Sequence, residues 1–94
     1  MPHMYILRCS NGEFYTGSTK DLERRLAQHQ AGEGANFTRK HLPVKLVYFE
    51  EYARVSEAFY REKQVQRWSH AKKEALIAGQ FDKIKKLGKK KFKK

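Results

Sequence analysis

The sequence predicts a small α/β domain in which a three-stranded antiparallel or mixed sheet is flanked by helices in the order β-β-α-β-α-α. Three observations support this class. Two short apolar runs are joined by turn-forming residues, a third apolar run follows near mid-chain, and apolar residues recur at helical spacing before and after it. The 94 residues contain neither an internal repeat nor a linker long enough to separate two domains.

The first two strands are predicted to form a β-hairpin. Residues 3–9 are apolar, the stretch Ser-Asn-Gly-Glu at residues 10–13 is typical of a turn, and residues 14–18 are rich in aromatic and β-branched side chains. In such a hairpin Tyr5 and Tyr15 lie within a few positions of being cross-strand neighbours, whose side chains are about 5 Å apart. The two phenols are therefore expected to lie close together.

A helix and a third strand follow the hairpin. Asp21 can cap a helix that runs to about residue 32, where a glycine-rich stretch ends it. A polar loop through Asn36 and Thr38 leads into the apolar residues 44–53. The continuous apolar character of this third run predicts a strand in the middle of the sheet.

Two more helices are predicted in the second half of the chain. Ser56 can cap one over residues 57–69, and another is expected over residues 71–78, closed by Gly79. Residues 81–87 are expected to add a last turn. In the first of these two helices, Phe59 and Trp68 flank the apolar stripe and are expected to pack against the core.

The positive charge is concentrated at the end of the chain. The formal net charge is +11, and residues 83–94 hold eight lysines and no acid, so residues 1–82 carry only 11 − 8 = +3. We expect a folded domain over residues 1–82 and a disordered lysine-rich tail over residues 83–94. Such a tail attracts a polyanion, most commonly nucleic acid. The alternatives are a solubilising tail, a docking segment for RNA or the ribosome, and a contact with an anionic membrane surface, for which no clear amphipathic anchor is present.

Cysteine content and hydropathy exclude several classes of protein. A single cysteine, Cys9, cannot form an internal disulfide, and no Cys/His pairing offers a structural zinc site. No run approaches the roughly 20 apolar residues that span a bilayer, and the chain start lacks the features of a signal peptide. A cytoplasmic protein without a membrane partner is expected. Its oligomeric state is open.

Three polar residues occupy apolar helix stripes. On a helical wheel, Glu62 lies within the stripe of its helix, and Arg25 and His29 share a stripe with Leu22 and Leu26. Taken singly, each residue also has a purely structural interpretation. Glu62 could form a salt bridge, Arg25 could be solvated at the edge of the stripe, and His29 could be a hydrogen-bonded core residue. A buried unpaired carboxylate costs several kcal/mol, so Glu62 requires a cation or access to solvent.

Taken together, these three residues and the two tyrosines form a set that can act on a phosphodiester. All five side chains are expected to point toward the same face of the sheet. Phosphodiester hydrolysis needs a base that activates water, positive charge on the phosphoryl oxygens and help for the leaving oxygen. A free tyrosine has a pKa near 10, and cationic neighbours such as Arg25 are expected to lower it.

At these positions the chain resembles the GIY-YIG nuclease superfamily, specifically its small stand-alone bacterial members, over residues 3–80. The first family triplet falls on residues 3–5, where only Tyr5 matches, and the second falls on Tyr15-Thr16-Gly17, where Tyr15 and Gly17 match. The family arginine falls on Arg25. The histidine of some members falls on His29, and the metal-binding glutamate falls on Glu62.

The resemblance implies the GIY-YIG fold and a metal-dependent DNA endonuclease. One tyrosine would activate water, Arg25 would neutralise the scissile phosphate, and Glu62 would hold one Mg²⁺ or Mn²⁺. His29 would orient a tyrosine or shuttle a proton. Which tyrosine is the base stays open, and Ser18 stands where some relatives carry a lysine, with Lys20 nearby.

The remaining expectations concern the nucleic acid. A strand glycine permits close approach of a ligand, and cationic side chains hold phosphates. The predicted contacts with nucleic acid are Gly17, Ser18, Lys20, Arg39, Lys40 and His41. The substrate is expected to be DNA, with RNA as an alternative, recognised as branched, damaged or single-stranded shape in DNA repair or processing. The rival function is a catalytically inactive nucleic-acid-binding module. Phe37 could stack on a base or close the edge of the core.

Overall fold

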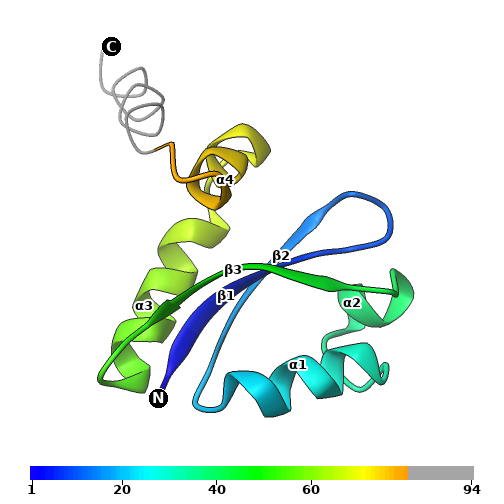
Figure 1. Ribbon diagram of the computed structural model, residues 1–94, viewed down its shortest axis with the longest axis horizontal. Coiled ribbons are helices and arrows are strands. Elements are labelled where there is room, and N and C mark those ends of the chain that lie inside the picture. Colours follow the sequence, from blue (N-terminus) through cyan, green and yellow to red (C-terminus); the bar gives the residue numbers. More distant parts are fainter. Residues whose placement is uncertain (81–94) are drawn as a thin grey trace.

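The structure, a computed structural model, describes residues 1–80 and contains one three-stranded antiparallel sheet (Figure 1). Strand β1 (His3–Arg8) lies in the centre, between β2 (Phe14–Thr19) and β3 (Lys45–Glu51). The predicted α/β class and the hairpin are confirmed. The predicted last turn and the lysine-rich tail lie outside the described residues.

Alternation along β1 gives the sheet two apolar faces. Met4 and Ile6 are buried on one face with Val65 and Leu76, whereas Tyr5 and Leu7 are buried in the core cluster of the other face. Successive strand residues point to opposite faces, so each cluster needs its own covering layer. This explains why a short sheet carries helices on both sides.

Four helices supply the two layers. Helices α1 (Leu22–Gln30) and α2 (Asn36–Lys40) lie on the Tyr5 face, while α3 (Val55–Gln66) and α4 (His70–Ile77) lie on the Met4 face (Figure 1). The predicted cap at Asp21 is confirmed, since its side chain accepts a hydrogen bond from the backbone of Arg24 at 3.1 Å. Gly32 and Gly79 follow α1 and α4 with φ of 80° and 75°, the left-handed conformation that glycine adopts without strain.

Several local expectations were wrong. The third strand is an edge strand, because the fully buried run at the sheet centre is Met4 to Leu7 of β1, while β3 is only half-buried. The segment expected as a polar loop contains the short helix α2. Helix α3 begins at Val55 with Arg54 as its N-cap, and the Glu57 side chain accepts from the Arg54 backbone at 3.1 Å, so Ser56 is not the cap.

Of the two aromatic residues that were expected to pack against the core, only Trp68 does so. Trp68 packs against the Met4 cluster as expected, but Phe59 is 52% exposed, because it lies on the outer side of α3. No helix among residues 1–80 is long and apolar enough to cross a membrane.

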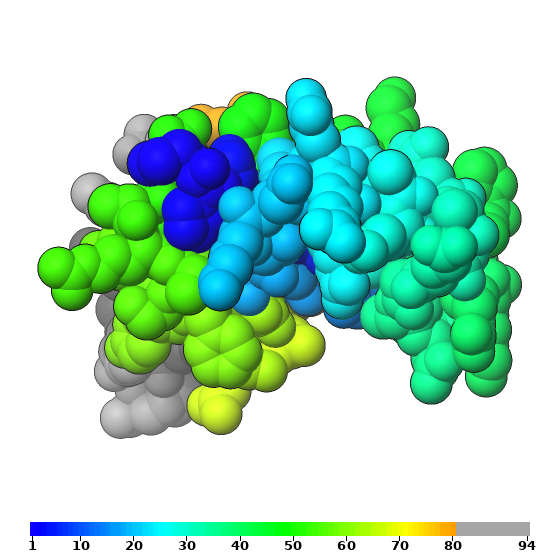
Figure 2. All heavy atoms as spheres, turned by 90° about the horizontal axis from the view of Figure 1, so that it is seen from below, coloured from blue at the N-terminus to red at the C-terminus, as the bar shows by residue number. Residues whose placement is uncertain are grey.

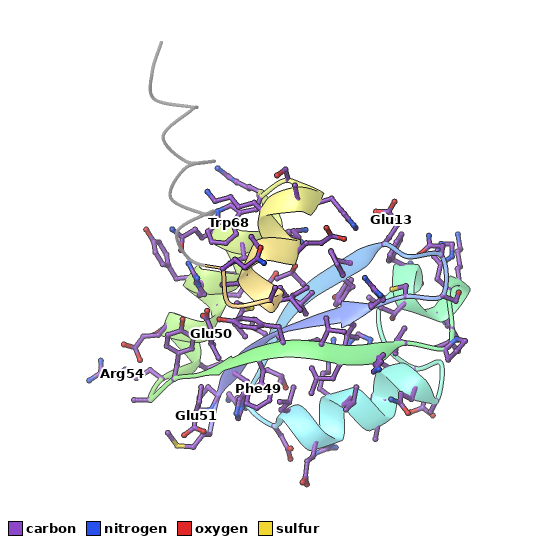
Figure 3. The ribbon with its side chains drawn as sticks, turned by 45° about the horizontal axis from the view of Figure 1, so that its top comes forward. Glu13, Phe49, Glu50, Glu51, Arg54 and Trp68 are labelled. Atoms are coloured by element: carbon purple, nitrogen blue, oxygen red, sulfur yellow. The ribbon has the colours of Figure 1, made fainter. Side chains whose placement is uncertain are left out.

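A hydrogen-bonded carboxylate fixes α3 on the sheet. Glu50 of β3 accepts two hydrogen bonds from Arg61, at 3.0 and 3.2 Å, and one from each of Tyr48 and Tyr52 at 2.5 Å. Figure 3 labels Glu50 on β3 and Trp68 near the end of α3, and the Arg61 guanidinium lies 5.1 Å from the Trp68 ring centroid. Because Arg61 directly precedes Glu62, these hydrogen bonds also set the position of Glu62.

Truncation of Ile6 tests the core of the Met4 face. Ile6→Ala is expected to lower the free energy of unfolding by about 2 to 5 kcal/mol, because it leaves a cavity at the centre of the sheet. Urea denaturation followed by circular dichroism measures the loss. The control Tyr60→Ala removes a side chain that is 76% exposed and should cost less than about 0.5 kcal/mol. Equal losses for the two variants would contradict the described core.

Candidate active site around the edge strand

The two tyrosines lie on one face of the hairpin. Tyr5 is opposite Gly17 and Leu7 is opposite Tyr15, so the tyrosines are diagonal neighbours, with ring centroids 6.5 Å apart. A Cβ atom at Gly17 would lie 2.5 Å from the Tyr5 hydroxyl. Gly17 therefore makes room for Tyr5, and the space that was expected to admit a ligand is filled by the Tyr5 ring.

His29 connects Tyr5 to α2. Its ring is fully buried, with Nε2 2.9 Å from the Tyr5 hydroxyl oxygen and Nδ1 2.9 Å from Oγ1 of Thr38. The His29 ring also contacts Tyr15, with centroids 5.3 Å apart. Burial and the charge of Arg25 lower the pKa of His29, so its imidazole is neutral at pH 7.

Arg25 faces the two phenols from one turn before His29. Its guanidinium donates to Gln28 at 3.2 Å and acts on the pKa of Tyr5. Burial raises the pKa of Tyr5 to about 12, although the hydrogen bond and charge of Arg25 oppose this shift. Burial also raises the pKa of Tyr15, with Arg25 again opposing. As expected, Arg25 lowers the pKa of both phenols, but desolvation outweighs this effect, so the net shift of each pKa is upward.

Glu62 approaches from the other face of the sheet. Ser18, which is opposite Met4 in the hairpin, donates from its hydroxyl to Oε1 of Glu62 at 2.7 Å, and Nζ of Lys63 lies 3.7 Å from Oε2. The expectation that all five residues face one side of the sheet was wrong, since α1 and α3 cover opposite faces. Beside burial, the Glu62 charge makes a smaller contribution to the raised pKa of both Tyr5 and Tyr15.

The two tyrosines, Arg25, His29 and Glu62 therefore lie around the edge strand β2. Figure 2 shows this side of the molecule, where the surface is hollowed between the cyan to teal α1 and α2 and the green to yellow α3, with blue hairpin residues between them. A pocket of about 270 Å³ opens beside Ser18 and extends along the start of α1. It is lined by Ser18, Thr19, Lys20, Asp21, Arg24, Arg25 and Gln28.

The predicted nucleic-acid contacts fall into two groups. Lys20 and Ser18 line the pocket next to Arg25, but Arg39, Lys40 and His41 lie at the end of α2. There, Arg39 donates to Asn36 at 2.9 Å, and the His41 ring contacts Phe37 at a centroid distance of 4.8 Å. Phe37 is 38% exposed, so its ring is partly available at the surface.

Three residues of the site were not predicted. Arg24 lines the pocket, Thr38 bonds His29, and a Cβ atom at Gly34 would overlap Nδ1 of His29. The sequence carried a signal only for Gly34, as a glycine five residues after the histidine. Thr38 stands in a polar stretch and Arg24 next to another arginine, so the sequence carried no signal for either residue.

The side chains near Ser18 fit a hard divalent cation. No group of three or more His, Cys, Asp or Glu side chains that could hold a metal occurs within residues 1–80. Mg²⁺ needs no such cage, because it is commonly held by one or two carboxylates, several waters and substrate phosphates. The Glu62 carboxylate meets this requirement, and the adjacent Ser18 hydroxyl is a further oxygen donor.

Comparisons with known proteins identify the family of the chain. A family model described as the GIY-YIG catalytic domain matches residues 1–75. A UPF0213 protein of the archaeon Halobacterium salinarum is 47% identical over 77 residues, covering 82% of this chain and 100% of the relative. A UPF0213 protein of Streptococcus pneumoniae is 41% identical over 80 residues, covering 85% of this chain and 81% of the relative.

Solved structures show the same fold. The solution structure of a UPF0213 protein from Bacillus halodurans matches with a TM-score of 0.54 and 39% identity, over 83% of this chain and 84% of that chain. The solution structure of a protein from E. faecalis matches with a TM-score of 0.55 and 34% identity, over 82% of each chain. The chain belongs to the GIY-YIG family, among the small UPF0213 proteins found in both bacteria and archaea.

Proposed function

We propose that this protein is a metal-dependent endonuclease that hydrolyses DNA phosphodiester bonds and selects its substrate by shape, in DNA repair or processing. The observation that carries the proposal is the meeting of two phenols, a guanidinium and a carboxylate around one edge strand. Membership of the GIY-YIG family supports a nuclease function and a metal requirement. A lone small module offers little surface for reading bases, which favours recognition of DNA shape.

Tyr15 is the better candidate for the base that activates water. Tyr5 is 1% exposed and its hydroxyl is committed to His29, whereas Tyr15 is only half-buried. Within residues 1–80 the Tyr15 hydroxyl has no hydrogen-bond partner, so it is available to contact a water molecule. In the step proposed, the Tyr15 phenolate takes a proton from water as the oxygen bonds to phosphorus and the bond from phosphorus to the leaving oxygen breaks.

Arg25 and Glu62 take complementary parts. Arg25 neutralises charge on the phosphoryl oxygens, since its guanidinium faces the phenols. Glu62 and Ser18 would hold Mg²⁺ or Mn²⁺, which would supply positive charge to stabilise the leaving oxygen. Lys20 and Arg24 would hold a neighbouring phosphate in the 270 Å³ pocket.

A second candidate function is a catalytically inactive nucleic-acid-binding module. One observation favours it. Nζ of Lys63 lies 3.7 Å from Oε2 of Glu62 and competes with a metal cation for the carboxylate. This candidate predicts DNA binding that is unchanged by Glu62→Gln and by removal of divalent cations.

Removing the carboxylate charge or the free phenol tests the nuclease proposal. With Mg²⁺ or Mn²⁺ and a panel of nicked, flapped, branched and single-stranded DNAs, Glu62→Gln and Tyr15→Phe are expected to lower the cleavage rate by at least about 100-fold. The matched control Glu51→Gln changes an exposed carboxylate on β3 and should cleave like wild type. Equal cleavage by wild type and both site variants would identify a contaminating nuclease and end the proposal.

The salt dependence of binding tests the phosphate pocket. Neither Lys20 nor Arg24 forms an ion pair among residues 1–80, so both charges are available to a phosphate. Replacing both by alanine is expected to reduce the slope of log K against log [salt] by roughly 0.9 for each duplex phosphate that the variant no longer neutralises. Fluorescence anisotropy at several salt concentrations measures the slope.

Lys45→Ala provides the control for this experiment. Lys45 is an exposed cation at the other end of the sheet, opposite Arg8. If Lys45→Ala changes the slope by half as much as the double variant or more, only net charge matters.

The pH dependence of cleavage tests the identity of the base. Because burial raises the pKa of Tyr15 above its usual value near 10, the phenolate fraction should increase about tenfold for each pH unit between roughly pH 6.5 and pH 9. The single-turnover cleavage rate is expected to rise with it. A rate that levels off near pH 7 would assign the base to a group with a lower pKa.

A further inference from the structure

The hydrogen bonds around His29 have a defined direction. The Thr38 hydroxyl lies 2.9 Å from the backbone carbonyl of Ala35 and donates its single proton there. Its oxygen, 2.9 Å from Nδ1 of His29, can then only accept, so Nδ1 carries the ring proton. In a neutral imidazole the other nitrogen, Nε2, is an acceptor, and the Tyr5 hydroxyl at 2.9 Å must donate to it.

This direction matters at Arg25. A guanidinium has donors and no acceptor, so it needs an oxygen lone pair from the Tyr5 hydroxyl. With the Tyr5 proton on the His29 side, a lone pair is free to face Arg25. In the other tautomer, Nε2 would donate to Tyr5, and the Tyr5 proton would be displaced toward the donors of Arg25.

We propose that Thr38 is a positioning residue, which fixes the tautomer of His29 and thereby leaves an oxygen lone pair of the Tyr5 hydroxyl for the Arg25 guanidinium, which also donates to Gln28. The proposal rests on the proposed nuclease function for the role of Arg25, and on geometry alone for the tautomer. It gives the short helix α2 a part in the site, although its exposed cations lie away from the phenols.

The packing around the chain of hydrogen bonds supports this role. His29 and Thr38 are both fully buried, so water cannot replace either partner. Gly34 lies so close to Nδ1 of His29 that any side chain at this position would displace the ring. The loop between α1 and α2 therefore packs directly against His29. A buried hydroxyl with two neutral partners and no other evident task is well suited to setting a tautomer.

The tautomer can be read directly by ¹⁵N NMR of the two His29 ring nitrogens in the free protein at pH 7.5. Wild type is expected to show a protonated Nδ1 and an unprotonated Nε2. Thr38→Val keeps the shape but removes the acceptor, and should shift His29 toward the opposite tautomer or a mixture, whereas Thr38→Ser should retain the wild-type pattern. A protonated Nε2 in wild type would overturn the proposal, even if Thr38→Val fails to fold.

Cleavage kinetics give the second readout. Thr38→Val is expected to lower kcat/KM by about tenfold or more, with Thr38→Ser close to wild type. Full activity of Thr38→Val with an altered tautomer would overturn the positioning role. Absence of cleavage in wild type would count against the proposed function alone, because the NMR result still decides whether Thr38 sets the tautomer.

Discussion

The position of β2 at the edge of the sheet is the constraint on which the candidate site depends. Its successive residues point to opposite faces, so Gly17 lies beneath the Tyr5 ring while Ser18 reaches Glu62. If β2 were a central strand, a neighbouring strand would block the way from one face of the sheet to the other. At an edge, side chains from the two faces can approach the same phosphate, and the helices of the two layers can each contribute a charged residue.

The polar groups buried at the candidate site and at Glu50 have stabilising partners, whereas Oγ1 of Thr16 and Nδ1 of His3 are buried without one. Tyr5, His29 and Thr38 form a continuous hydrogen-bonded chain on one face, and Glu62 accepts from Ser18 on the other. The Glu50 carboxylate binds Arg61 and two tyrosines, which hold its pKa below the usual value although burial opposes ionisation. Burying these groups without partners would cost several kcal/mol each, a large part of the stability of a domain of this size.

The sequence predicted the fold and the candidate residues better than their arrangement. Short apolar runs and turn residues located β1 and β2, and polar residues in apolar stripes identified Arg25, His29 and Glu62. A helical wheel gives the angle of a residue on its own helix but not the face of the sheet that the helix covers, so the opposed approach of Glu62 could not be foreseen. Thr38 was assigned to a polar loop, because only the tertiary structure shows that it is buried against His29.

Paramagnetic broadening by Mn²⁺ tests most directly whether groups from the two faces form one site. In a two-dimensional NMR titration of the free protein, substoichiometric Mn²⁺ should broaden first the amide signals nearest Glu62 and Ser18, and then those of Gly17 and Tyr15 on β2. The effect should disappear in Glu62→Gln. Broadening centred on another acidic residue, or broadening near Glu62 that leaves β2 unaffected, would contradict a single site around the edge strand.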